Sequence, residues 1–457
     1  MRNLPRCNQS WISAVSVSLA LIVMVPLANI AVTPEREALP PSKIDLLHRL
    51  EQPGNSRRPK GKLAENDAWV AKFQVGTDGV IKMLWKRQLG SPSSDASRGI
   101  ATDRNGNVLI TGYTRGALGG TSQGYFDAWV AKYSRNGSLL WSQQLGTSSF
   151  DLSNDVATDR DGNVFITGFT GNALAGIYKG GSDAWVAKYS PDGTLAWTRQ
   201  LGTTSVDESY SIATDSKGNV IISGSTYGTV GGSGKGGSDA WVAKYSPDGT
   251  LAWTRQFGSS SSDYSYGVAI DSNDNVFITG TTSGALVGAN QGLDDAWVAK
   301  YSPNGTLKWM RQLGSSSSDN SYAVATDSSG NVFMSGLTAG PLGSTHKGKG
   351  DAWVAKYSPT GALMWTKQLG SSSSDYSKGV ATNSSGNVFI AGATSGALGG
   401  INQGLYDAWV AQFSPHGKQL WVRQDRTPQI DVATEVAVDS NDDVLTTGYT
   451  DGNFAGD

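Results

Sequence analysis

Seven aspartates recur at steps of 56 residues, and carboxylates repeated in this way have two uses. They are Asp95, Asp151, Asp207, Asp263, Asp319, Asp375 and Asp431. Carboxylates gathered around one mouth of a channel attract a cation and can take part in catalysis. Alternatively, each aspartate accepts hydrogen bonds from backbone N–H groups of its own loop. The constant spacing favours the hydrogen-bonding interpretation, because a loop of the same length in every repeat needs the same hydrogen bonds to hold it.

Two other acidic segments resemble the start of a calcium-binding loop. Residues 159–163 read Asp-Arg-Asp-Gly-Asn, and residues 271–275 read Asp-Ser-Asn-Asp-Asn. An EF-hand needs a bidentate glutamate at the end of its loop, but the first segment has Thr170 there. No helical pattern flanks either segment. A hydrogen-bonded turn explains both, so we expect no resident cofactor, with Ca²⁺ at the repeated aspartates as the alternative.

The residues that most enzymes use are scarce in this chain. Its single cysteine, Cys7, precedes the repeats, and we expect His346 and His416 at opposite ends of the fold. This separation argues against an acid–base mechanism that needs two histidines. A formal charge of −2, with 17% charged residues, gives no electrostatic footprint for nucleic acid. The remaining enzyme hypothesis is a lyase-like or hydrolase-like site built from carboxylates.

Six glycine-rich segments of 12 residues each are the better candidates for binding. They span 115–126, 171–182, 227–238, 283–294, 339–350 and 395–406. Surface loops on a rigid scaffold are a usual place for ligand recognition. The side chains that we expect to face a ligand or partner are Leu118, Gln123, Lys179, Lys235, Gln291, His346, Lys347 and Gln403.

These candidates must be positioned by the strands around them, and tryptophan marks those strands. The phrase Asp-Ala-Trp-Val-Ala-Lys, once ending in Gln, occurs seven times, and a second tryptophan follows each copy. We interpret both tryptophan series as packing between repeats, with stacking of exposed copies against carbohydrate as the alternative. The first series is Trp69, Trp129, Trp185, Trp241, Trp297, Trp353 and Trp409, and the second is Trp85, Trp141, Trp197, Trp253, Trp309, Trp365 and Trp421.

Each repeat divides into four short β-prone runs separated by turn residues. In one repeat the runs are 211–215, 220–224, 239–246 and 250–257, and no run has a helical period. Self-similarity at this period, with four strands per unit, predicts an all-β, seven-bladed β-propeller of four-stranded antiparallel blades. The first copy of the phrase lacks the two strands that should precede it. Strands within 67–89 are therefore expected to complete the blade begun by 432–450, which closes the ring.

The repeated motif resembles a known family. A composite of several copies, Gly-Val-Ala-Thr-Asp-Ser-Ser-Gly-Asn-Val-Phe-Ile followed by Asp-Ala-Trp-Val-Ala-Lys-Tyr-Ser-Pro-Asp-Gly-Thr-Leu-Ala-Trp, is similar to the bacterial SBBP β-propeller repeat. The resemblance covers residues 67–457. It implies an exported or surface-located propeller, and it implies no particular activity.

The residues before the repeats are of a different kind. Arg2 and Arg6 precede an uncharged, largely apolar stretch, which predicts a signal peptide or a signal anchor over 1–32. Residues 33–66 form a proline-rich and charged linker with a short helix expected at 42–52. We therefore expect an exported binding module in the periplasm, outside the cell or on its surface. Its expected partner is an envelope or extracellular protein or glycan, and it meets a membrane only through residues 12–32 if these stay uncleaved.

Overall fold

The computed structural model describes residues 66–76 and 79–454, which form 28 strands. These strands are β1 (Asp67–Val75), β2 (Ile81–Leu89), β3 (Asp95–Thr102), β4 (Val108–Thr114), β5 (Asp127–Tyr133), β6 (Leu139–Leu145), β7 (Asp151–Thr158), β8 (Val164–Thr170), β9 (Asp183–Tyr189), β10 (Leu195–Leu201), β11 (Asp207–Thr214), β12 (Val220–Thr226), β13 (Asp239–Tyr245), β14 (Leu251–Phe257), β15 (Asp263–Ile270), β16 (Val276–Thr282), β17 (Asp295–Tyr301), β18 (Leu307–Leu313), β19 (Asp319–Thr326), β20 (Val332–Thr338), β21 (Asp351–Tyr357), β22 (Leu363–Leu369), β23 (Asp375–Thr382), β24 (Val388–Thr394), β25 (Asp407–Phe413), β26 (Gln419–Asp425), β27 (Asp431–Val438) and β28 (Val444–Thr450). The expected signal segment and linker lie outside the described residues.

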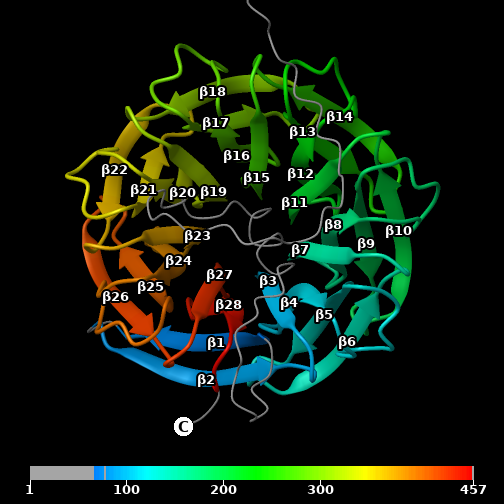
Figure 1. The fold of residues 1–457 in the computed structure, drawn as a ribbon, viewed down its shortest axis with the longest axis horizontal. Coiled ribbons are helices and arrows are strands. Elements are labelled where there is room, and N and C mark those ends of the chain that lie inside the picture. Colours follow the sequence, from blue (N-terminus) through cyan, green and yellow to red (C-terminus); the bar gives the residue numbers. More distant parts are fainter. Residues whose placement is uncertain (1–65, 77–78, 455–457) are drawn as a thin grey trace, which may run out of the picture. The chain divides into compact units, whose positions relative to one another are not determined.

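The strands form seven separate four-stranded antiparallel sheets, which confirms the predicted β-propeller. Figure 1 shows the sheets as blades around a central axis, with the first strand of each blade innermost. We number the blades in chain order: blade 1 is β3–β6, blade 6 is β23–β26, and blade 7 contains β27, β28, β1 and β2. In the described part of the chain, no helix is both long and apolar enough to cross a membrane.

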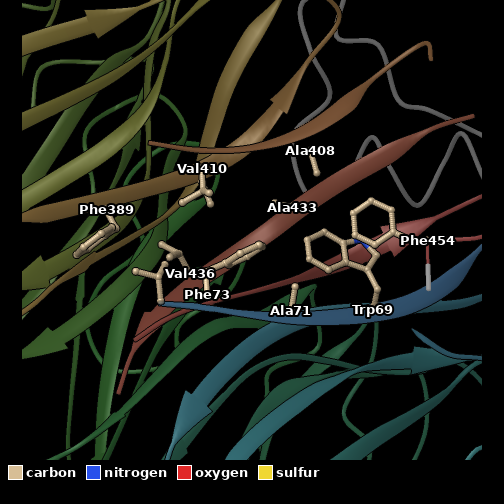
Figure 2. Close-up of a cluster of buried hydrophobic side chains, with 11 residues drawn as sticks. Trp69, Ala71, Phe73, Phe389, Ala408, Val410, Ala433, Val436 and Phe454 are labelled. Carbon is tan, nitrogen blue, oxygen red and sulfur yellow. The ribbon is translucent and has the colours of Figure 1, made fainter. Parts of the chain in front are cut away.

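The ring closes by the predicted joint between the two ends of the propeller. Strand β1 pairs with β28 from Asp67↔Thr450 to Phe73↔Val444, so blade 7 takes two strands from each end. Strands β1 and β2 have nine residues each, whereas the corresponding strands of blade 1 have seven. Trp69, Ala71 and Phe73 of β1 pack with Val436 and Phe454 (Figure 2).

The first strand of each blade begins four residues earlier than the apolar run suggested. In blade 3 it starts at Asp207, and the register shifts between Ser209 and Ser211 when β11 pairs with β12. This β-bulge brings the strands close together at Gly224, where an added Cβ would lie 1.8 Å from the Glu208 carbonyl oxygen. The same close approach recurs in every blade, so only glycine fits there.

Tryptophans of the first series join neighbouring blades through the core. Trp185 of blade 2, for example, packs with Leu109, Val130 and Ala128 of blade 1. All seven members of this series are at most 2% exposed. Truncating such a buried side chain typically costs about 3–5 kcal/mol.

The second tryptophan series connects blades by hydrogen bonds at the outer edge. Trp141 Nε1 donates to the Pro191 carbonyl in the next blade at 3.1 Å, and the equivalent bond recurs for Trp85, Trp197, Trp253, Trp309 and Trp365. These indoles are partly buried. Both series therefore lie at blade boundaries.

Candidate functional site

The propeller has two ends that differ in the length of their connections. The end that we call the loop end carries the 12-residue loops between second and third strands, and the segments that lead into the next blade. The end that we call the turn end carries the tight turns between first and second strands and between third and fourth strands. All the candidate ligand-facing residues lie at the loop end.

Each long loop is held by a glutamine and an aspartate that the sequence did not single out. In blade 1, Gln144 Nε2 donates to Asp127 Oδ2 at 2.6 Å and to the Gly116 carbonyl at 3.0 Å. Gln144 Oε1 accepts from the Leu118 N–H at 3.0 Å. Asp127 Oδ2 also accepts from the Gln123 N–H at 2.7 Å. One Gln–Asp pair thus binds both halves of the loop.

The same Gln–Asp tie recurs around the ring. Its glutamines are Gln88, Gln144, Gln200, Gln256, Gln312, Gln368 and Gln424, each bonded to the aspartate that opens the Trp phrase of its blade. The signal that could have revealed this tie was the recurrence of both residues in all seven copies.

Most of the candidate side chains are exposed because their loops are held through the backbone. The N–H groups of Gln123, Lys179, Lys235, Gln291, Lys347 and Gln403 donate to the tie aspartates, while their side chains lie in solvent. Leu118 is partly buried against the core of its blade boundary. His346 is partly buried, with Nδ1 3.5 Å from Asp351 Oδ2, and thus takes part in a tie.

Large apolar side chains are also exposed on these loops. Ile177 is 84% exposed, Ile401 74%, Leu405 72% and Leu293 68%, and Tyr125 and Tyr227 are also exposed. Exposed apolar side chains on adjacent loops are typical of interaction surfaces. The identity of these residues differs from blade to blade, whereas the Gln–Asp tie beneath them does not.

The seven repeated aspartates are buried at the loop end, where each one is tied to its own loop. Asp151 Oδ2, for example, accepts from the Thr147 N–H at 2.6 Å, and Oδ1 accepts from the Thr170 hydroxyl at 2.5 Å. All seven are 0% exposed and accept the N–H of the residue four positions earlier. Their carboxyl groups therefore do not face the solvent of the channel mouth.

Burial raises the pKa of all seven carboxyl groups above the usual aspartate value. Hydrogen bonds from the loop offset part of this effect, and the charge of the nearby tie aspartate adds to it. Among the described residues, no ion pair involves any of the seven. Nor do the residues that the structure describes include a group of three or more metal-ligating side chains.

At the turn end, most of the buried carboxylates form ion pairs with lysine. Asp215 Oδ1 accepts from the Lys217 and Asn219 N–H groups, and Oδ2 lies 2.7 Å from Lys244 Nζ. Burial alone would raise the pKa of Asp215, but the bonds from Lys244 and Asn219 hold it below the usual value. Equivalent lysine–aspartate pairs occur in blades 1, 4, 5 and 7.

Blade 6 replaces this ion pair at both positions. Asn383 stands where the other turns have aspartate, and Gln412 stands where the other phrases have lysine. Losing only one partner would leave a buried charge unpaired, which is costly. The two neutral residues in one blade indicate that the pair acts as a unit.

The segments that resemble calcium loops are tight turns of this same kind. Asp159 Oδ1 accepts from the Asp161 and Asn163 N–H groups, and Asp271 bonds its own turn in the same way. Asp274 has a φ of 60° at the position where most turns have glycine, and it accepts two bonds from Ser216. The carboxylates thus shape the turns.

The blades also differ at one position of their innermost strands, which was not identified from the sequence. The third residue after each repeated aspartate is Arg98, Asn154, Tyr210, Tyr266, Tyr322, Lys378 or Thr434. The rings of Tyr210, Tyr266 and Tyr322 follow one another at centroid distances of 5.3 and 5.7 Å. Lys378 Nζ lies 3.9 Å from the Tyr322 ring, and Arg98 donates to Asn154 at 2.6 Å.

Comparison with known proteins identifies the repeat. The beta-propeller repeat family SBBP matches residues 84–119, 140–174, 196–232, 252–286, 308–343, 365–400 and 408–455. An uncharacterized WD repeat-containing protein, L264, of Acanthamoeba polyphaga mimivirus is 22% identical over 505 residues, covering 82% of this chain and 36% of that protein. The regulatory protein FlaEY of Caulobacter vibrioides is 25% identical over 213 residues, covering 42% of this chain and 20% of that protein. The chain therefore spans about a third or less of the length of these relatives.

This chain also matches solved structures at low sequence identity. The periplasmic gluconolactonase PpgL of Pseudomonas aeruginosa is 13% identical with a TM-score of 0.46, over 80% of this chain and 98% of that one. The Pan2 WD40 domain of Neurospora crassa is 10% identical with a TM-score of 0.41, over 77% and 88%. The family match covers more than half of the chain, and it shows that this protein belongs to the SBBP beta-propeller repeat family.

Proposed function

We propose that this protein is an exported binding or interaction module that recognises a protein or glycan at the cell envelope through its loop end. A propeller repeat suits this role, because its blades hold many loops at fixed positions on one end. The expected signal segment at residues 1–32 supports export, and an uncleaved segment would anchor the protein through residues 12–32.

The proposal rests on one observation: in each long loop the backbone is held in place while several side chains remain exposed to solvent. The backbone is held by the Gln–Asp tie, as in Gln144 and Asp127, while side chains such as Gln123 stay exposed. Because the tie bonds backbone N–H groups, side chains on the loop can vary without loss of the anchor. This arrangement gives a rigid scaffold with a variable surface.

Repeated weak contacts are the mechanism that this surface favours. The exposed apolar residues Ile177, Leu293, Ile401 and Leu405 lie on three different loops. Contacts from several linked loops add through effective concentration, so that affinity exceeds that of any single loop. A partner that reaches several loops at once, such as a glycan chain or an extended protein, would benefit from this arrangement.

The test is binding of the full chain to glycan and protein arrays, with two matched variants. The loop variant carries Ile177→Ser, Leu293→Ser, Ile401→Ser and Leu405→Ser. The rim variant carries Leu139→Ser, Leu195→Ser, Leu251→Ser and Leu307→Ser, which are exposed on the outer strands. We expect the loop variant to bind at least about tenfold more weakly, a change of about 1.4 kcal/mol, and the rim variant to bind like wild type. Equal binding by the loop variant would contradict the proposal.

Two other functions make different predictions. An enzyme that uses the repeated aspartates would lose turnover in Asp263→Asn with Asp319→Asn, although burial of both carboxyls gives it no direct support. A calcium-stabilised spacer would melt at a lower temperature after chelator treatment. An unchanged melting temperature would count against the spacer.

A further inference from the structure

A cavity at the turn end lies on the opposite side of the propeller from the proposed binding loops. Its volume is about 320 Å³, and it is lined by first-strand ends and turns of blades 1 to 4. Thr102, Thr158 and Thr214 line it from the innermost strands, and Arg104, Arg160 and Ser216 line it from the turns. This volume falls at the lower end of the range for small-molecule sites.

Two arginines distinguish this cavity from the rest of the ring. Arg104 and Arg160 occupy the same position in the turns of blades 1 and 2. The equivalent residue is serine in the other five blades: Ser216, Ser272, Ser328, Ser384 and Ser440. Two adjacent blades therefore depart from the repeat at the wall of one cavity.

Both guanidinium groups are available to a ligand. Their side chains are exposed, and neither makes a hydrogen bond or ion pair with any residue that the structure describes. The nearby threonine hydroxyls retain acceptor lone pairs, since Thr158 donates to the Thr102 carbonyl at 2.9 Å and Thr214 donates to the Thr158 carbonyl at 2.8 Å. The cavity thus offers charged donors beside hydroxyl acceptors.

The carboxylates in the cavity wall are already engaged. Asp215 pairs with Lys244 at 2.7 Å, and Asp271 pairs with Lys300 at 3.3 Å. Asp159 accepts three bonds from its own turn. Asp274 accepts hydrogen bonds from the N–H and the hydroxyl of Ser216 at 2.8 and 2.7 Å. The formal charges of the wall balance when both lysines are counted. Because the carboxylates are engaged, the two guanidinium groups remain as donors and the threonine hydroxyls as acceptors for a ligand.

We propose that this cavity binds a small polyhydroxylated anion, namely a sugar bearing one carboxylate or phosphate. The planar guanidinium fork matches carboxylate and phosphate oxygens and can bind them in a bidentate manner. Arg104 and Arg160 hold the anionic group, while the threonine and serine hydroxyls bond the hydroxyls of the sugar. This site lies apart from the loop end and does not depend on the proposed function there.

The test is isothermal titration of the full chain at low salt with galacturonate, glucose 6-phosphate, inorganic phosphate and glucose. The variant is Arg104→Ser with Arg160→Ser, which gives these turns the residue of the other five blades and should preserve folding. The control is Arg135→Ser with Lys217→Ser, which removes two exposed positive charges of the same end outside the cavity. Thermal unfolding checks that both variants are folded.

We expect galacturonate or glucose 6-phosphate to bind saturably, the arginine variant to bind it at least tenfold more weakly, and the control to match wild type. Three results would overturn the proposal. The first is that neither galacturonate nor glucose 6-phosphate binds saturably. The second is that glucose binds as tightly as the sugar anion, and the third is that the arginine variant binds the sugar anion as tightly as wild type. Inorganic phosphate that binds as tightly as both sugar anions would also contradict it, because the sugar hydroxyls would then contribute nothing.

Discussion

The two ends of this propeller are built from the same repeat, yet they handle buried carboxyl groups in opposite ways. At the loop end, Asp263 accepts the Ser259 N–H and hydroxyl, makes no ion pair with the described residues, and has a pKa raised by burial. At the turn end, Asp215 is paired with Lys244, and its pKa is lowered despite burial.

This difference corresponds to a turn end whose side chains mostly repeat from blade to blade and a loop end whose exposed side chains vary. Asp or Asn shapes each tight turn between a first and a second strand by accepting backbone N–H groups, as Asp159 and Asn383 do. Where lysine pairs with this aspartate, both partners are needed, as the joint replacement by Asn383 and Gln412 in blade 6 illustrates. A Gln–Asp tie instead anchors long loops through their backbone. The loop end can therefore present different side chains, whereas most of the turn end repeats the same ones. Arg104 and Arg160 are among the exceptions at the turn end.

The largest effect is expected where an ion pair is broken at the turn end. Asp215→Asn leaves the Lys244 ammonium buried without its carboxylate, so the free energy of unfolding should fall by about 3 kcal/mol. Denaturant unfolding at pH 7 measures the change. Adding Lys244→Gln reproduces the blade 6 arrangement and should restore most of the loss. A double variant as unstable as the single one would contradict the pairing.

A smaller loss is expected when a loop tie is removed. Gln144→Ala deletes the group that bonds Leu118, Gly116 and Asp127, which should cost about 1–2 kcal/mol, since solvent replaces part of the lost hydrogen bonding. Hydrogen exchange at residues 116–119 should accelerate in this variant.

Gln123 of the same blade provides the matched control. Its side chain is exposed, so Gln123→Ala should change stability by less than about 0.5 kcal/mol. If both glutamine variants lost the same stability, the division between tie and presented side chain would be wrong.

The smallest effect is expected at the repeated aspartates. Asp263→Asn keeps the shape and an acceptor oxygen while removing a buried charge that lacks a cation among the described residues. The free energy of unfolding at pH 7 should change by less than about 1 kcal/mol, well below the cost of Asp215→Asn. A larger cost at Asp263 than at Asp215 would reverse the comparison between the two ends.

The architecture could be predicted from the sequence because strand pattern and turn residues recur with a fixed period. The seven blades and the joint between β1 and β28 follow from counting copies of the Trp phrase. The early start of β11 was missed because a β-bulge interrupts the alternation of side chains at Ser209 and Ser211.

The site was harder to predict because its contacts join residues far apart in the sequence. Gln144 lies 26 residues after Leu118, whose N–H it accepts, and Lys132 pairs with Asp103 across a blade. Recurrence shows that such residues matter but not which ones meet. Arg104 and Arg160 were not predicted because they are not part of the repeated pattern. They replace the serine of the other five blades, and only the fold shows that both line one cavity.

The pH dependence of stability follows from the two directions of pKa shift. The loop-end aspartates, whose pKa values are raised, contribute stability that is present below about pH 4 and lost as pH rises through their folded-state pKa values. Asp103 and Asp215, whose pKa values are lowered, contribute stability that is present above about pH 4 and lost as pH falls through their folded-state values. A fall in pH therefore stabilises the folded protein through the loop-end aspartates and destabilises it through Asp103 and Asp215.

The most direct test of this contrast is an NMR titration of the aspartate carboxyl carbons in the folded protein. Signals assigned through Asp263→Asn and Asp215→Asn should titrate on opposite sides of the usual aspartate pKa, with Asp263 above it and Asp215 below it. Titration of both carboxyls at the same pH, or in the reverse order, would contradict the account of the two ends.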